Sequence, residues 1–245
     1  YLNLLYKNQQ TPVQNKHLMK SKIQYSFLVV LFFISPLVWA QQNHNSFLIA
    51  KKNKASTIYI DQNTDPLITW AVNELATDIQ EITGQKPAIV RTKKNRIENG
   101  IYIGQISDNL FKNHKTKSLK GAWEKFSISK EKNNLHIVGS DIRGTIYGIF
   151  KTAERLGVSP WKWWADVNPI RKEKLEISLP KEGITESPSV QFRGIFLNDE
   201  DWGLQPWAAK TFEPETGDIG PKTYEKIFQL LLRLKANCIW PAMHP

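Results

Sequence analysis

The stretch Phe192–Gly203 reads FRGIFLNDEDWG, and the rest of the chain can be organised around it. It begins apolar and then carries Asn198 followed by three consecutive acids, Asp199, Glu200 and Asp201. Adjacent carboxylates repel one another, so a fold that keeps them together needs a chemical reason. A buried strand that ends in an acidic, glycine-terminated loop is typical of the first strand of a barrel whose rim carries the catalytic groups.

The residues that follow continue this barrel pattern. A loop over 199–220 leads to Pro221, which opens a helix with apolar side chains at helical spacing. Residues 237–245 are predicted to be a second buried strand that ends in another rim cluster. Strand, loop, helix and strand make a βαβ unit, so 190–245 is expected to be the truncated start of a (β/α)8 TIM barrel. Arg193 comes too early in its strand for the rim and is expected to pair inside the lower barrel.

The upstream part has a different pattern, in which short strands surround two helices. The sequence predicts strands at 57–60, 87–90, 101–104 and 175–179, a hairpin of 123–130 with 135–139, and helices from Asp65-Pro66 to Gly84 and from Asp141 to Gly157. We therefore expect an α+β domain over 41–185, a mixed sheet with two helices on one side. A polar linker over 180–188 is expected to join it to the barrel.

The N-terminal region is typical of a secretory signal. The chain begins with Tyr1, and a basic segment after Met19 precedes an apolar run that is short and interrupted by proline. We expect 1–18 to be non-native upstream residues, Met19–Ala40 to be a cleaved signal peptide, and Gln41 to open a secreted or periplasmic chain. A membrane anchor is the alternative.

Composition and missing motifs exclude several classes of function. The net charge is +10, but the lysines are scattered and no basic recognition helix accompanies them, so a solvated surface is favoured over nucleic-acid binding. Cys238 is the only cysteine, which excludes an intrachain disulfide and a cysteine-rich zinc site. Phosphate-binding glycine loops, a serine-nucleophile elbow and the zincin motif are absent from the sequence. No cofactor and no metal are therefore predicted.

The acidic run offers two candidate catalytic groups. Side chains alternate along a strand, so Asp199 and Asp201 would share one face, and Asn198 and Glu200 the other. Two carboxylates facing one cleft could hold sugar hydroxyls, activate a water as general base, or bind a hard cation. A solvated acidic loop is the structural alternative.

Aromatic and polar side chains near this run extend the candidate site. Trp240 and His244 follow the second predicted strand, and Trp207 and Glu213 lie in the long loop. Each could reach a sugar, or could fill an ordinary structural role. The run 161–167, WKWWADV, could be a sugar-binding platform, although a wedge between domains is favoured because packing area is needed there.

Five segments together resemble one enzyme family. They are 161–167 (WKWWADV), 193–204 (RGIFLNDEDWGL), 206–210 (PWAAK), 219–224 (IGPKTY) and 240–244 (WPAMH). They resemble glycoside hydrolase family 115, the xylan α-1,2-glucuronidases, which remove glucuronic acid or its 4-O-methyl ether from xylan. The resemblance covers most of the chain from the first predicted strand onward and is dense from Pro160 to the end.

The resemblance implies an N-terminal α+β domain, a catalytic barrel, further C-terminal domains, and inversion at the anomeric carbon. Inversion needs an acid and a base whose carboxyls are about 6.5–9.5 Å apart. The implied general acid lies beyond Pro245, so this chain alone is expected to be inactive. Asp199 is the first catalytic candidate, and the sequence does not choose between it and Asp201. The resemblance implies that the acidic run, Trp240 and His244 line the uronic-acid pocket. With the candidates from the residues themselves, the predicted substrate-binding residues are Asn198, Glu200, Trp207, Glu213, Trp240 and His244.

The implied partners are glucuronoxylan or its oligosaccharides, with no nucleic acid and no stable membrane anchor, and a homodimer is compatible with the resemblance. Two other functions stay open from the residues alone. One is a non-catalytic carbohydrate-binding module that uses the tryptophan platform, and the other is a different barrel glycosidase such as a hexosaminidase.

Overall fold

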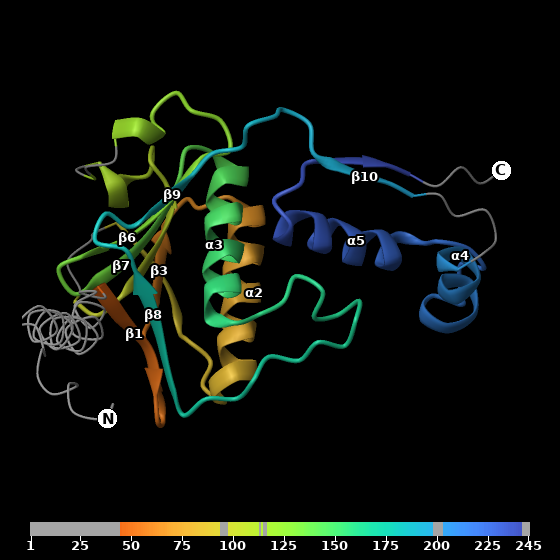
Figure 1. The fold of residues 1–245 in the computed structure, drawn as a ribbon, viewed down its shortest axis with the longest axis horizontal. Coiled ribbons are helices and arrows are strands. Elements are labelled where there is room, and N and C mark those ends of the chain that lie inside the picture. Colours follow the sequence, from red (N-terminus) through yellow and green to blue (C-terminus); the bar gives the residue numbers. More distant parts are fainter. Residues whose placement is uncertain (1–44, 94–97, 113, 115–116, 198–202, 242–245) are drawn as a thin grey trace, which may run out of the picture. The chain divides into compact units, whose positions relative to one another are not determined.

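A computed structural model describes residues 45–93, 98–112, 114, 117–197 and 203–241 (Figure 1). These residues all belong to one structural unit, whose larger part is built from two sheets and two long helices. None of the helices among these residues is long and apolar enough to cross a bilayer.

The main sheet has six strands and is mixed, as the sequence predicted. Its strands are β3 (Ile58–Asp61), β4 (Ile89–Thr92), β5 (Ile101–Gln105), β6 (Phe126–Glu131), β7 (Asn134–Gly139) and β9 (Ile184–Glu186). Their order is β4-β3-β5-β7-β6-β9, in which the first four run parallel and the last two pair antiparallel. The predicted β6–β7 hairpin is confirmed. β9 corrects the prediction of a linker over 180–188, because its residues pair with β6.

A second, antiparallel sheet has the order β2-β1-β8. Its strands are β1 (Asn45–Lys51), β2 (Lys54–Ala55) and β8 (Lys174–Leu179). β8 was predicted and alternates strictly between exposed and buried residues, whereas β1 and β2 were not predicted. β1 pairs with β8 across more than a hundred residues of sequence, a contact that no local pattern reveals.

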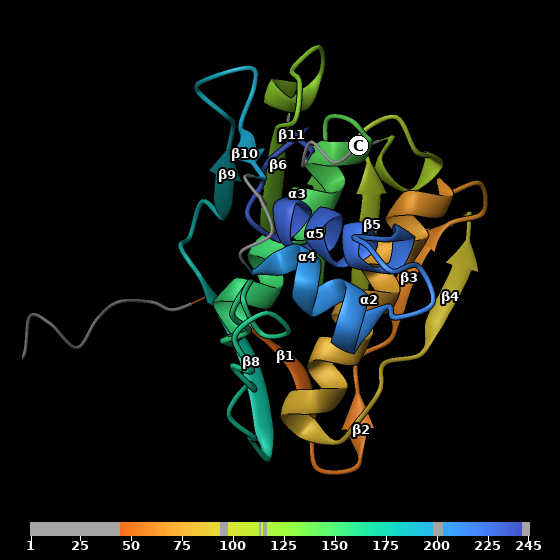
Figure 2. The ribbon, with the colours of Figure 1, turned by 90° about the vertical axis from the view of Figure 1, so that its right-hand side faces the viewer.

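Two long helices, α2 (Pro66–Thr83) and α3 (Ile142–Leu156), lie side by side against the sheets (Figures 1 and 2). Both begin and end as predicted. Asp65 accepts a hydrogen bond from Leu67 N at the start of α2, and Asp141 accepts one from Gly144 N at the start of α3. Left-handed glycines, Gly84 and Gly157, end the two helices. The apolar faces of both helices join strands of both sheets in the main core.

A smaller core covers the opposite face of the main sheet. Side chains alternate along β3, β5 and β7, so the residues next to those of the main core point the other way. This second core contains Tyr59, Tyr102, Leu110, Phe111, Leu119 and Val138. Two short 3-10 helices, η1 (Asn109–Phe111) and η2 (Lys117–Leu119), contribute three of these residues.

The C-terminal part has the predicted strand–helix–strand order. Its elements are β10 (Gly194–Phe196), α4 (Leu204–Trp207), the π-helical turn η3 (Ala208–Phe212), α5 (Pro221–Arg233) and β11 (Cys238–Trp240). β10 and β11 run parallel and in register, from Gly194 opposite Cys238 to Phe196 opposite Trp240. This is a βαβ unit, and its place as the start of a barrel stays a prediction.

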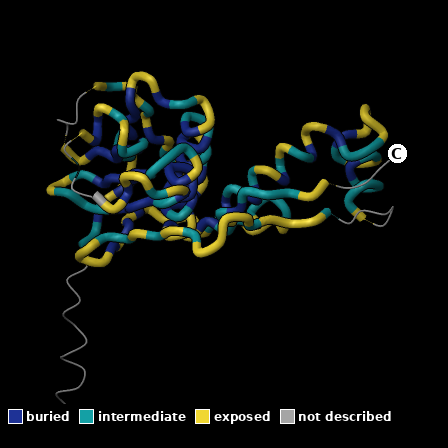
Figure 3. The backbone as a smooth tube through the Cα atoms, turned by 90° about the horizontal axis from the view of Figure 1, so that it is seen from above, coloured by how far each residue is buried: buried dark blue, intermediate teal, exposed yellow. Residues whose placement is uncertain are grey.

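The burial predicted for these two strands is wrong for the described chain. All three residues of β10 are exposed, and β11 is half-buried to exposed, as the colours along the C-terminal segment show (Figure 3). The reason is that α5 covers one face only, through Leu197 and Ile239, and the two strands have no further strand neighbours among the described residues.

Candidate functional site

The ends of β10 and β11 lie side by side, which places the two predicted rim segments at one edge. The Leu197 amide donates to the Trp240 carbonyl over 2.9 Å, directly after the register from Gly194 to Phe196. Parallel strands present their carboxyl ends at the same edge, where α/β proteins keep their chemistry. The residues that follow, Asn198, Asp199, Glu200, Asp201 and His244, lie outside the described residues.

Trp240 is the predicted rim residue that the structure does describe. It ends β11 and 67% of its surface is exposed. A large exposed indole at a strand end is available to stack on a sugar ring. Its contact with a substrate stays a prediction.

Trp207 packs with the tryptophan run of residues 161–164. Four rings, Trp163, Trp164, Trp207 and Phe212, form what we call the tryptophan cluster. The ring centroids of Trp163 and Trp164 are 4.8 Å apart, and Trp207 stacks on Phe212 at 5.2 Å. The Lys226 ammonium lies 5.4 Å from the centre of the Trp163 ring, within reach of a cation–π interaction. Segments more than forty residues apart in sequence therefore meet in one aromatic group.

A cavity of about 770 Å³ lies beside this cluster. Indole rings of Trp163, Trp164 and Trp207 line it together with Glu81, Lys162, Asp166, Asn168, Gly203 and Leu204. Its volume falls in the range typical of small-ligand sites, about 300–1,000 Å³. Gly203, which lines this cavity, lies two residues after Asp201 in the sequence.

Lys162 lines the cavity but its charge is already compensated. Its ammonium lies 2.7 Å from Asp78 Oδ1 and 2.9 Å from the Glu81 carboxylate. Burial disfavours the charged amine, but the two carboxylates outweigh this effect and raise its pKa above the ordinary value. Lys162 is therefore always charged at neutral pH and held by its own partners, which makes it a poor partner for a uronic-acid carboxylate.

Asp78 is the centre of a buried ionic group that sequence reasoning missed. Its carboxylate also accepts from Arg233 over 2.8 Å, and Arg233 reaches Glu74 over 3.2 Å. Asp78 and Arg233 are both buried, so the pair fastens α2 to α5. The missed signal is the position of Asp78, an acid on the apolar stripe between Leu75 and Ile82.

The tryptophan run acts in part as the wedge that the sequence favoured. Trp164 packs against the small core of α5, which contains Ile227 and Leu231, and its indole N–H donates to the Lys226 carbonyl over 3.2 Å. Trp161 instead exposes about half of its surface (48%). Packing therefore accounts for Trp164, and the platform interpretation concerns only the more exposed rings.

Glu213 is buried and caps α5. Its carboxylate accepts from the amides of Lys222 and Thr223 over 3.1 and 3.0 Å, and from the Thr223 hydroxyl over 3.1 Å. Burial opposes ionisation, but these hydrogen bonds outweigh it and hold the pKa of Glu213 below its ordinary value. A Cβ on Gly220 would lie 2.4 Å from this carboxylate, so any other residue there would force the Glu213 side chain to shift. The substrate-binding role predicted for Glu213 is untested, and the contacts described here are structural.

Arg193 forms its ion pair with the N-terminal part. Its guanidinium binds the buried Glu124 carboxylate, and its Nε donates to the Lys235 carbonyl over 2.9 Å. Asn237 Nδ2 donates to the same Glu124 over 2.9 Å. Burial opposes the charge of Glu124, but Asn237, Arg193 and Arg143 outweigh it and lower its pKa. The expected pairing inside the lower barrel is corrected, because the start of β10 and the start of β11 are both tied to Glu124.

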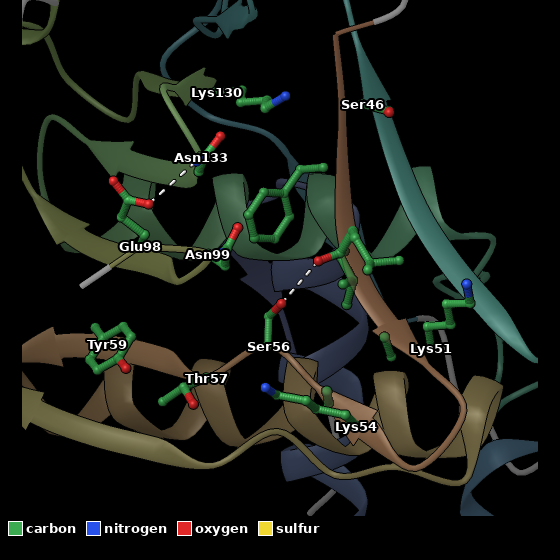
Figure 4. Close-up of a pocket in the computed structure, with 15 residues that line it drawn as sticks. Ser46, Lys51, Lys54, Ser56, Thr57, Tyr59, Glu98, Asn99, Lys130 and Asn133 are labelled. Carbon is green, nitrogen blue, oxygen red and sulfur yellow. Dashed lines mark hydrogen bonds between the residues drawn. The ribbon is translucent and has the colours of Figure 1, made fainter.

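A second hollow of about 680 Å³ lies between the β1–β2 hairpin and the loops that precede β5 and β7 (Figure 4). Lysines 51, 54 and 130 line it. Two hydrogen bonds join residues of its lining, one from Ser56 to the Leu48 carbonyl and one from Asn133 to Glu98. It contains none of the residues predicted from the sequence to bind a substrate.

Comparison with known proteins gives two family matches, one in each part of the chain. Residues 185–245 match the family described as Glycosyl hydrolase family 115, and residues 39–152 match Glycosyl hydrolase family 67 N-terminus. Among solved structures, a family GH115 4-O-methyl-α-glucuronidase with specificity for decorated arabinogalactans is 39% identical, with a TM-score of 0.71. The match covers 81% of this chain and 26% of that one, so the chain spans about a quarter of the length of this relative.

More distant matches carry no weight. A GH20 exo-β-N-acetylglucosaminidase from Vibrio harveyi is 14% identical over 80% of this chain and 22% of its own, with a TM-score of 0.46. A GH138 enzyme that targets pectin rhamnogalacturonan II is 15% identical over 75% of this chain and 18% of its own, with a TM-score of 0.44. No match was found among curated proteins.

The resemblance to glycoside hydrolase family 115 is therefore confirmed, and this protein belongs to that family.

Proposed function

We propose that this chain is the N-terminal part of a secreted, inverting α-glucuronidase that removes glucuronic acid or its 4-O-methyl ether from a plant polysaccharide. The observation that carries the proposal is the 39% identity with a family 115 4-O-methyl-α-glucuronidase over 81% of the chain. We further propose xylan as the polysaccharide, while the relative is specific for decorated arabinogalactans. The backbone that carries the uronic acid is therefore the part of the proposal that most needs a test.

The cavity beside the tryptophan cluster supports a sugar as ligand. A pyranose ring has apolar faces that suit indole surfaces, and hydroxyls that suit carboxylate and amide groups. Asp166 and Asn168 supply such polar groups on the cavity wall, and Gly203, also on the wall, lies two residues after Asp201 in the sequence. The cavity is thus a candidate for binding the sugar residues that surround the cleaved bond.

Chemically, we assign Asp199 and Asp201 to one wall of the reaction centre. An inverting glycosidase uses one carboxylate to activate water and a second carboxyl, about 6.5–9.5 Å away, to protonate the leaving oxygen. Asp199 or Asp201 would activate or position the water. The acid would come from a later strand of a barrel that β10, α5 and β11 begin. Trp240 and His244 would complete this side of the uronic-acid pocket.

The test uses the longer protein that contains this sequence, beside the 245-residue chain itself. Released glucuronic acid and 4-O-methylglucuronic acid are measured on glucuronoxylan, on arabinogalactan and on decorated oligosaccharides. We expect release by the longer protein and none by the 245-residue chain. Replacing Asp199 by Asn should lower kcat by about 100-fold or more, because a positioned general base contributes roughly that factor.

Asp201→Asn tests the alternative carboxylate, and Asp218→Asn is a matched control in the same long loop, at a residue that hydrogen-bonds within its own turn. Near-normal turnover in both Asp199→Asn and Asp201→Asn would remove the acidic run from catalysis. Release of uronic acid from arabinogalactan but not from xylan would overturn the xylan assignment alone. Binding of xylan by the chain without hydrolysis by the longer protein would favour a carbohydrate-binding module instead.

A further inference from the structure

Three side chains from separate elements converge on the outer face of the main sheet, away from α2 and α3. His114 follows η1, Glu131 ends β6, and His136 lies in β7. Nε2 of His114 lies 3.3 Å from Oε1 of Glu131, and Nδ1 of His136 lies 3.8 Å from Oε2 of the same carboxylate. One candidate ligand atom from each residue lies within 4.8 Å of the other two.

The register of the β6–β7 hairpin brings two of the three together. Ser129 pairs with His136, and Glu131 pairs with Asn134, so alternation puts Glu131 and His136 on the same face. His114 reaches that face because the turn after η1 folds back, with the His114 amide donating to the Phe111 carbonyl over 2.9 Å. The three residues share no local sequence motif, which explains why the sequence alone predicted no metal.

We propose that His114, Glu131 and His136 form a Zn²⁺ site with two imidazole ligands and one carboxylate ligand. In a tetrahedral zinc site with ligand bonds of about 2.0–2.1 Å, neighbouring ligand atoms are about 3.3 Å apart. The distance of 3.3 Å from His114 Nε2 to Glu131 Oε1 already has this value. His136 Nδ1 lies 3.8 Å from the other oxygen, Oε2, so the carboxylate has to turn until one oxygen faces both imidazoles. Imidazole nitrogen favours zinc and its transition-metal neighbours over the hard cations Mg²⁺ and Ca²⁺.

The surroundings suit metal ligands better than an ion pair. The side chains of His114 and His136 are only 2% and 5% exposed. Both imidazoles contact the Phe111 ring, and His136 also contacts the Tyr102 ring. Burial lowers the pKa of both imidazoles, that of His136 to about 4, although the Glu131 charge acts in the opposite direction. Both rings are therefore neutral at pH 7, which weakens a charge interaction with Glu131 and is the state that binds a metal.

The geometry leaves room for a water ligand and an entry path. Three protein ligands leave the fourth position of a tetrahedral zinc open. Glu131 is 39% exposed, so the ion can enter on its side. The buried Ser129 hydroxyl faces His136 across the strand pair and has no hydrogen-bond partner among the described residues, so it can bind a zinc-bound water. The ion would fasten the turn after η1 to the hairpin, a role separate from the proposed glucuronidase site.

The test measures Zn²⁺ binding by the whole chain after treatment with EDTA. Titration calorimetry should give one tight site per chain, and zinc should raise the thermal midpoint. Co²⁺ should give the visible absorption of a four-coordinate site. Glu131→Gln keeps the shape of the side chain. Glu131→Gln and His114→Gln should each weaken zinc binding by about 100-fold or more, since even the groups around the ligands change metal affinity about 10–100-fold.

Two controls keep the outcome specific. His17→Gln, His44→Gln and His244→Gln together remove every other histidine and should leave the stoichiometry and affinity unchanged. Glu173→Gln, at an exposed acid directly before β8, should have no effect. Binding that survives both Glu131→Gln and His114→Gln, or that is lost in the triple-histidine control, would overturn the proposal. So would zinc binding at millimolar concentrations only, or a preference for Mg²⁺ or Ca²⁺.

Discussion

Replacing Asp78 by Asn should loosen the attachment of α5 to the N-terminal part. Asp78 is fully buried in α2 and faces two cations, Arg233 at 2.8 Å and Lys162 at 2.7 Å. The amide keeps the size of the side chain but removes its charge. The substitution therefore tests the ionic interaction and creates no cavity.

The expected loss of stability depends on the acidic partners that the two cations still have after the substitution. Breaking a buried ion pair by removing one partner costs about 3–5 kcal/mol, because the remaining charge is left buried without compensation. Arg233 still reaches Glu74 at 3.2 Å, and Lys162 still reaches Glu81 at 2.9 Å. These second partners place the expected loss at the lower end, about 3 kcal/mol in the free energy of unfolding.

Urea unfolding followed by tryptophan fluorescence and by circular dichroism measures the loss. Three of the nine tryptophans belong to the tryptophan cluster beside α5, whereas circular dichroism reports on the whole chain, so unfolding of the C-terminal part alone would separate the two curves. Glu176→Gln is the matched control, because it breaks the exposed pair with Lys174, which is worth no more than about 1 kcal/mol. A loss for Asp78→Asn no larger than the control loss would refute the reasoning.

Two further predictions concern pH. Glu213→Gln should lower the thermal midpoint at pH 7, because the pKa of Glu213 is lower in the folded than in the unfolded chain. The resulting stabilisation is complete at a pH above the unfolded-state pKa and is lost as the pH falls through the folded-state pKa. The difference in thermal midpoint between variant and parent should therefore shrink at about pH 3, and a constant difference would contradict the capping role. Burial lowers the pKa of His136 to about 4, beside Glu131 and His114, so the unfolded chain takes up its proton first as the pH falls. In EDTA, stability should fall between about pH 6.5 and pH 4 by a few kcal/mol, and His136→Gln should flatten that slope in urea unfolding measured across the range.

Local signals in the sequence were sufficient to predict an element where neighbouring residues determine its ends. Asp65 and Gly84 set the two ends of α2, and the turn between β6 and β7 sets a hairpin, because caps and turns depend on residues within a few positions of one another. Contacts distant in sequence defeated the same reasoning. β1 pairs with β8 and β9 joins β6, and both partners lie tens of residues away.

The candidate site shows the same division. The acidic run and Trp240 could be found because they follow strand patterns, and the resemblance to the family was carried by contiguous segments. Asp78, Glu124 and His136 were not found. Each is an isolated titratable residue whose significance depends on a partner brought in from another element, and one sequence does not show which partner that is.

The N-terminal part holds the starts of β10 and β11 in place. A two-stranded sheet is marginal by itself, and β10 and β11 are covered by α5 on one face only. Their position depends on Glu124, which holds Arg193 before β10 and Asn237 before β11. Tyr147 adds a third tie, since its hydroxyl donates to the Ala236 carbonyl over 3.0 Å.

These ties all lie at the amino ends of the two strands, opposite to the ends that lead into the acidic run and into the segment after Trp240. The N-terminal part therefore fixes the direction of both strands while leaving their carboxyl ends free for chemistry. The exposed apolar surface of Phe196 and Trp240 at those ends then has a physical meaning, because barrel strands are normally buried by neighbouring strands and helices. Within the proposed enzyme, the α+β domain acts as the support from which the barrel is built, and the acidic run is the first wall of the site that the barrel completes.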